Sequence, residues 1–166
     1  MLQENIQIGI TFFVLIILQF LVFSNIGFFG FINPFVYLLF LVRYRLDGNQ
    51  SIFILNSFAL GFFVDLILGT AGAHTIATLT VAYLRPLIVG FSFGINADVP
   101  YAMIKGTRIS NQLTYLGLII FLHALIYYSI SYFSWLAFFQ IMKNAFLTSV
   151  LTFILIWLIL GFYKTK

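Results

Sequence analysis

The chain has 166 residues, of which 63% are hydrophobic and only 7% are charged. Water-soluble domains carry about 25% charged residues, so this composition excludes a water-exposed globular fold and indicates an integral membrane protein. The net charge of +4 is spread thinly, which argues against nucleic-acid binding, and the lack of cysteine excludes disulfides and thiolate metal sites.

Crossing about 30 Å of hydrocarbon takes about 20 apolar helical residues. By this measure the sequence predicts an all-α bundle of six transmembrane helices, forming one polytopic domain over residues 1–166. The expected spans are 6–23, 26–42, 51–69, 71–91, 113–131 and 142–162. We expect the first span to be a retained anchor, because no basic residue precedes it and no A-x-A site follows it.

The second span is interrupted by Asn33 and Pro34. Proline has no amide proton, so it should break or kink this helix near its beginning. In lipid the freed carbonyl groups need partners, so we expect this part of the chain to pack inside the bundle.

The basic residues predict the orientation. With six spans, one side of the membrane carries six basic residues and the other side carries only Lys143. The six are Arg43, Arg45, Lys105, Arg108, Lys164 and Lys166. Since basic loops stay cytoplasmic, both termini are expected in the cytoplasm.

Two connections on the opposite side are informative. The sequence GTAGA at 69–73 is short and small, which predicts a tight helical hairpin between the third and fourth spans. The segment 132–140 is aromatic, and tyrosine and tryptophan settle at headgroup depth. This segment is either an interfacial aromatic belt or a docking surface for a partner's membrane-proximal segment.

Polar residues inside the spans are the candidate site. Gly61, Asp65 and Gly69 are spaced four apart and share one helix face, so small residues flank the acid and allow a close helix approach. His74 begins the next span across the short turn. Asp65 can therefore be satisfied by His74 or by backbone amides, or it can form part of a polar pocket or partner contact.

His74, Thr78 and Arg85 lie on one stripe of the fourth span, which should face inward because a charge facing lipid costs at least about 2.5 kcal/mol. Arg85 either snorkels to the cytoplasm or joins the polar pocket. His123, in the middle of the fifth span, is expected to be a hydrogen-bonded core residue.

The usual signatures of catalysis are absent from the sequence. It holds no HExxH, no glycine-rich phosphate loop, no GxSxG and no paired carboxylates at helical spacing. We therefore expect no enzyme activity, no cofactor and no metal site.

The stretches Asn33-Pro34, Gly61-x-x-x-Asp65-Leu66, Gly69-x-x-Gly72 and Ala82-Tyr83-Leu84-Arg85 together resemble the bacterial rod shape-determining MreD family, over about residues 30–90. The resemblance implies a non-enzymatic protein of the bacterial inner membrane that partners the bitopic protein MreC. MreB, RodA and a class B transpeptidase belong to the same elongation machinery. It also implies a fold similar to the S subunits of energy-coupling-factor transporters, with a cavity that Asp65, His74 and Arg85 would line or gate.

The leading hypothesis is a scaffold that binds an MreC-like partner and helps to place peptidoglycan synthesis. Two alternatives stay open: a vitamin-binding S subunit of a transporter, and a membrane-embedded transferase acting on a lipid-linked substrate. Retention of a small molecule would favour the first, and loss of activity on Asp65→Ala the second.

Overall fold

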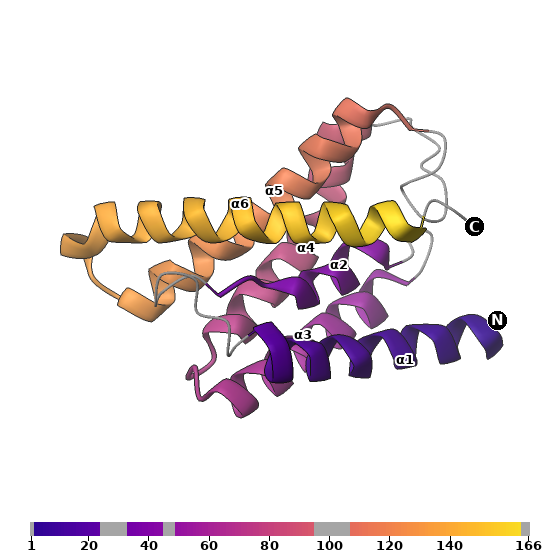
Figure 1. The fold of residues 1–166 in the computed structure, drawn as a ribbon, viewed down its shortest axis with the longest axis horizontal. Helices are drawn as coiled ribbons and strands as arrows, with labels where there is room; N and C mark the ends of the chain where they lie inside the picture. Colours follow the sequence, from indigo (N-terminus) through magenta and orange to yellow (C-terminus); the bar gives the residue numbers. More distant parts are fainter. Residues whose placement is uncertain (1, 24–32, 45–48, 95–106, 164–166) are drawn as a thin grey trace.

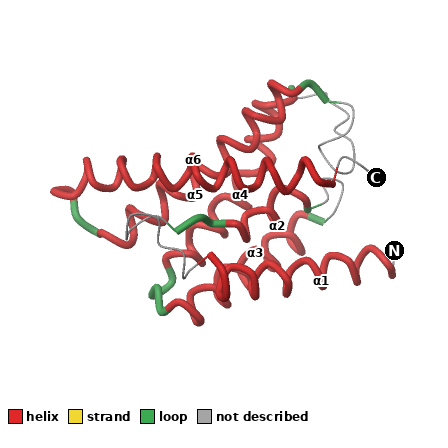
Figure 2. The backbone as a smooth tube through the Cα atoms, viewed as in Figure 1, coloured by secondary structure: helices red, strands yellow, loops and turns green. Residues whose placement is uncertain are grey.

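The computed structural model describes residues 2–23, 33–44, 49–94 and 107–163 (Figure 1). This part of the chain is helical and contains no strand, so the all-α class is confirmed for it (Figure 2). Its elements are α1 (Leu2–Leu18), the π-helical turn η1 (Gln19–Phe23), the 3-10 turn η2 (Val36–Leu38), α2 (Leu39–Arg43), α3 (Gln50–Leu68), α4 (Ala73–Phe93), α5 (Ile109–Tyr132), the 3-10 turn η3 (Trp135–Ala137) and α6 (Phe138–Tyr163).

Among the described residues, four helical stretches are long and apolar enough to cross a membrane. They are Gln50–Leu68, Ala73–Phe93, Ile109–Tyr132 and Trp135–Phe162. A shorter apolar helix covers Ile8–Phe23. These stretches fall on the third to sixth and the first of the expected spans.

The helices give the bundle two distinct ends. α1 begins and α6 ends at the same end, which we call the terminal end (Figure 1). The α3–α4 turn and the connection between α5 and α6 lie at the other end, which we call the turn end.

The second expected span differs from its prediction. Residues 33–35 are not helical, and η2 and α2 together hold only eight residues, three and five respectively. A helix of eight residues is about 12 Å long, too short to cross a membrane. The expected range 26–42 is therefore not one continuous helix; its first part, 26–32, lies outside the described residues. Pro34 supplies the physical reason, because it favours an extended residue before it and offers no amide to a helix.

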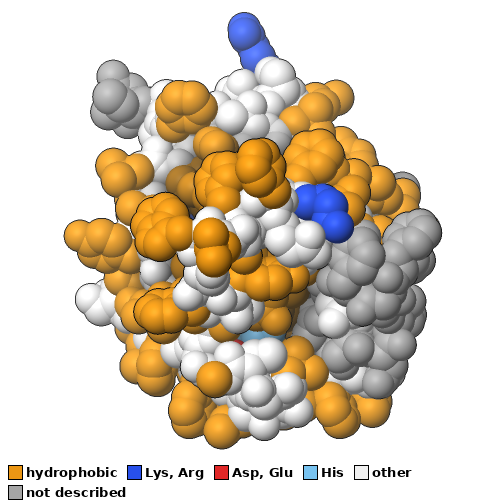
Figure 3. Space-filling model, turned by 90° about the vertical axis from the view of Figure 1, so that its left-hand side faces the viewer, with side chains coloured by type: hydrophobic (Ala, Val, Ile, Leu, Met, Phe, Trp, Pro, Cys, Tyr) orange, Lys and Arg blue, Asp and Glu red, His pale blue; other side chains and the backbone are white. Residues whose placement is uncertain are grey.

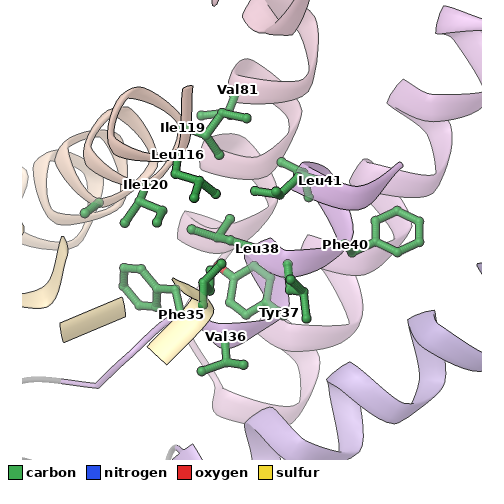
Figure 4. Close-up of a cluster of buried hydrophobic side chains, with 14 of the residues drawn as sticks. Phe35, Val36, Tyr37, Leu38, Phe40, Leu41, Val81, Leu116, Ile119 and Ile120 are labelled. Carbon is green, nitrogen blue, oxygen red and sulfur yellow. The ribbon is translucent and has the colours of Figure 1, made fainter. Parts of the chain in front are cut away.

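This interrupted stretch, residues 33–44, forms the centre of the bundle, and we call it the core segment. The eight consecutive residues Phe35–Val42 are all buried, with exposed fractions of 3% or less. Figure 4 shows Leu38 and Leu41 on the side of Val81 of α4 and of Leu116, Ile119 and Ile120 of α5, while Phe40 points away from them. Burial on every side explains the uniformly apolar sequence of Phe35–Val42, and it keeps these eight side chains off the surface of the bundle.

Glycines shape the α3–α4 hairpin in two ways. Gly69 ends α3 with φ of 68°, and Gly72 precedes α4 with φ of 91°, a backbone conformation that glycine adopts without strain. Gly61 lies where α3 meets α4, and a Cβ there would stand 2.7 Å from the Thr75 Cα and 2.9 Å from the His74 carbonyl oxygen. The close helix approach expected at Gly61 is therefore made by α4 of the same chain.

We predict that Gly61→Ala destabilises the protein by about 1–3 kcal/mol, because backbone atoms of α4 would have to move away to admit the methyl group. Thermal unfolding in detergent or bicelles measures the loss. Gly117→Ala is the matched control, since a Cβ at Gly117 meets nothing within 4 Å and alanine favours the helix. Equal behaviour of the two variants would contradict a tight contact at Gly61.

Candidate functional site

The core segment is held by side chains that bond its backbone. The amide oxygen of Gln19 accepts from the Val36 and Tyr37 amides at 3.0 and 3.4 Å, and the Gln19 amide nitrogen donates to the Pro34 carbonyl at 3.0 Å. The hydroxyl of Thr152, on α6, accepts from the Phe35 amide at 3.0 Å. An unpaired backbone group costs several kcal/mol in an apolar interior, so these two polar side chains make the non-helical stretch possible.

We predict that Thr152→Val costs about 1–3 kcal/mol, because valine has nearly the same shape but leaves the Phe35 amide without its acceptor. Thermal unfolding and faster hydrogen exchange of the Phe35 amide report the loss. Thr80→Val serves as the control, since the Thr80 hydroxyl is exposed and bonds only back to the Ile76 carbonyl of its own helix. A Thr152→Val protein as stable as this control would show that the Phe35 bond is dispensable.

Tyr37 joins two histidines from different helices at the centre of the bundle. Its hydroxyl lies 2.7 Å from Nδ1 of His74, on α4, and 2.9 Å from Nε2 of His123, on α5. All three side chains are at most 2% exposed. We call these three residues the Tyr37 cluster; it ties the core segment to α4 and α5.

Aromatic rings hold the His74 imidazole in place. Tyr127 stacks on it with ring centroids 4.3 Å apart and planes 28° apart, while Phe35 meets it edge-on at 5.4 Å. Phe35 also meets His123 edge-on at 5.1 Å. With their rings fixed by packing, the histidines keep their nitrogens aimed at Tyr37.

Asp65 caps the first turn of α4. Its carboxylate accepts from the backbone amides of His74 and Thr75 at 3.0 and 2.7 Å, from the Thr75 hydroxyl at 2.5 Å and from the Thr70 hydroxyl. Negative charge at a helix N-terminus is favourable, and four donors compensate for its burial. Of the partners that the sequence left open, Asp65 therefore uses the backbone amide of His74, while the ring of His74 bonds Tyr37.

We predict that Asp65→Asn loosens the hairpin turn by about 0.5–2 kcal/mol, because the amide NH2 would face two donors whichever way it turns. Hydrogen exchange of the His74 and Thr75 amides measures the effect. Asn49→Ala removes the exposed cap of α3, where water replaces the lost acceptor, and should change exchange much less. Unaltered exchange at His74 in Asp65→Asn would overturn the capping role.

Arg85 is buried, with an exposed fraction of 2%, so of the two alternatives that the sequence left open its head group does not snorkel to the surface. Its Nε donates to the Tyr115 hydroxyl at 2.9 Å, an Nη donates to the Tyr44 carbonyl, and the guanidinium lies over the Phe53 ring with Cζ 4.4 Å from the centroid. These contacts stabilise the buried guanidinium more than exposure to water would. Arg85 thus fastens the end of the core segment to α3, α4 and α5.

The candidate residues predicted from the sequence therefore do not form one site but lie at separate positions in the bundle. Asp65 and His74 lie together at the turn end, and Arg85 forms its own network nearer the terminal end. Asn33 is exposed, whereas the neighbouring Pro34 is buried at the start of the core segment.

Sequence reasoning missed three residues of the site: Gln19, Tyr37 and Thr152. Each stands in an apolar run and carries one polar group, the pattern of an ordinary membrane-spanning residue. The useful signal was Pro34, since a broken helix needs outside partners and a glutamine or threonine in another span can supply them.

A surface groove of about 500 Å³ opens where α5 and α6 meet at the turn end. Its walls are mainly apolar and include Leu125, Ser129, Phe133, Trp135, Ile141 and Met142. Phe133 and Trp135 are 90% and 92% exposed, and Leu136 beside them is 99% exposed. The aromatic connection is thus a prominent apolar projection rather than part of the core.

Comparison with known proteins returned no matching family model, no similar curated protein and no solved structure of matching fold. Within the described ranges, histidine, aspartate and glutamate form no group of three or more that could hold a metal ion.

Proposed function

We propose that this chain is a non-enzymatic scaffold of the bacterial inner membrane, of the MreD type, which binds an MreC-like single-span protein. In this role it helps to position peptidoglycan synthesis and so maintains rod shape. MreB, RodA and a class B transpeptidase would be associated directly or through that partner. The proposal includes six membrane crossings, cytoplasmic termini and a fold similar to transporter S subunits.

The observation that carries the proposal is the contrast between the interior and the turn end. Asp65, His74 and Arg85 bond groups of their own chain, which leaves apolar helix faces as the chemistry available to other molecules. Among the described residues, the apolar side chains with the highest exposed fractions gather at the α5–α6 connection, where Phe133, Trp135 and Leu136 are at least 90% exposed.

The groove at this connection suits an apolar helix with a polar flank. Packing rather than water drives helix association in lipid, so a shaped groove matters more there than apolar area alone. Ser129 and Ser134 add polar atoms to its apolar walls, and they could bond the partner where its helix leaves the membrane. A bitopic protein with a large external part meets both requirements.

Affinity purification from native membranes in mild detergent, followed by mass spectrometry of proteins and small molecules, tests the proposal. We predict stoichiometric recovery of a single-span protein with the wild-type chain, and a loss of at least about tenfold with the double variant Trp135→Ala, Leu136→Ala, equivalent to about 1.4 kcal/mol. Both residues are exposed, so the variant should fold normally.

Phe91→Ala provides the matched control, because Phe91 is 77% exposed near the terminal end of α4 and lies far from the groove along the bundle. Partner recovery should persist in this variant. Recovery that survives the Trp135 and Leu136 changes would overturn the docking surface. Recovery of ATP-binding cassette subunits, or of a bound vitamin, would replace the scaffold with the transporter alternative.

A further inference from the structure

The hydrogen bonds of the Tyr37 cluster constrain where its hydrogens lie. A tyrosine hydroxyl has one hydrogen to donate and can accept from a neighbour, and a neutral imidazole has one N–H and one bare nitrogen. With histidine nitrogens at 2.7 and 2.9 Å, the Tyr37 hydroxyl can bond both only by donating to one and accepting from the other. Two arrangements satisfy this condition.

The remaining nitrogen of His123 distinguishes the two arrangements. Its Nδ1 is buried and has no hydrogen-bond partner among the residues that the structure describes. A buried N–H without an acceptor is rarer and more costly than a bare acceptor nitrogen. His123 therefore carries its hydrogen on Nε2 and donates to Tyr37, which in turn donates to Nδ1 of His74. The shorter of the two distances, 2.7 Å, belongs to this second bond.

This order leaves no place for an additional proton. If His74 were protonated at Nδ1, two N–H groups would point at the Tyr37 oxygen, and the Tyr37 O–H would have no acceptor. His123 could then move its own hydrogen from Nε2 to Nδ1, so that Nε2 accepts from Tyr37. The new Nδ1–H would then have no acceptor among the described residues. Either way, one more proton leaves a buried O–H or N–H without an acceptor, which destabilises the arrangement that holds the core segment.

We infer that the Tyr37 cluster is an acid-sensitive lock on the core segment, closed when both imidazoles are neutral and released when a proton enters at His74. His74 is the more accessible of the two histidines, with 2% exposed against 0% for His123. Figure 3, a view of the turn end, shows histidine and carboxylate atoms at the bottom of a hollow in that face. A proton can therefore arrive from the turn end.

The groups around the cluster set its response. Asp65 of α3 is the charged side chain beside His74, and on α5 Tyr127 stacks on the His74 ring with Tyr128 packed against Tyr127. The nearby side chains of α6 are the hydroxyls Thr148 and Thr152, and that of the first helix is the amide of Gln19. None of these hydroxyls or amides titrates near neutrality, so the two histidines are the switching groups in the described surroundings.

The chain contains only two histidines, which makes a direct measurement practical. Histidine labelled with ¹⁵N in the full-length protein, reconstituted in nanodiscs, gives two imidazole spectra that single His→Gln changes can assign. At pH 7.5 we expect both rings to be neutral with hydrogen on Nε2. On acidification, the signal of protonated His74 should rise together with hydrogen exchange at the Val36 and Tyr37 amides. A hydrogen on Nδ1 of His123 at pH 7.5, or protonation of His74 without faster exchange, would overturn the lock.

A matched variant tests the same point through stability. In His74→Asn the amide oxygen can replace Nδ1 as the acceptor from Tyr37, and in His123→Gln the amide NH2 can replace Nε2–H as the donor, yet neither side chain titrates. The folded lock excludes a proton that an unfolded histidine binds, so stability should fall as the pH falls. From pH 7.5 to 4 we expect the wild-type Tm to drop by at least about 3 °C more than that of the double variant.

Titration of Asp65 in the same range affects both proteins, because its carboxylate keeps the same backbone and hydroxyl donors in the double variant. Equal Tm losses in the two proteins would overturn the proposal. If the double variant does not fold, the labelled wild-type protein is sufficient. Protonation of His74 accompanied by faster exchange at the Val36 and Tyr37 amides supports the proposal, and protonation without it overturns the proposal.

Discussion

The need to satisfy backbone groups in an apolar interior governs this fold. Pro34 prevents a continuous second helix. The chain after it enters the middle of the bundle with backbone amides that have no acceptor within a helix. Gln19 and Thr152 supply the partners from either side, one from the end of the first helix and one from α6. Because these two side chains lie 133 positions apart (152 minus 19), the core segment can settle only when both ends of the chain have assembled around it.

The polar residues of this chain act as connections between helices. Asp65 joins α3 to the start of α4, Arg85 joins α4 to α5 and to the end of the core segment, and Tyr37 joins that segment to both. In lipid, apolar contacts alone distinguish weakly between one helix pairing and another, since the acyl chains offer the same chemistry. A few directional bonds can therefore select one arrangement from many apolar ones.

Hydropathy was sufficient to predict the long helices, because the length of α3 to α6 follows from apolar runs bounded by polar residues. Local chemistry was sufficient for Pro34, whose effect depends on its own ring, and for Gly61 as a packing residue. For Asp65 the sequence offered His74 or backbone amides without deciding between them, and for Arg85 it named no partner. The partners in the structure are a nearby backbone amide and a carbonyl 41 positions away, and backbone groups carry no sequence signal. Tyr37 was missed because its two histidine partners become neighbours only in the assembled bundle.

α5 connects the interior to the exposed groove. His123 and Tyr127 face the core segment, while Leu125 and Ser129, on neighbouring turns of the same helix, line the groove. A packed helix moves as a unit, so a rearrangement around the Tyr37 cluster would displace one wall of the groove within about two helical turns. The same geometry works in reverse: a partner helix seated in the groove would restrain α5 and so favour the arrangement of histidines that closes the cluster.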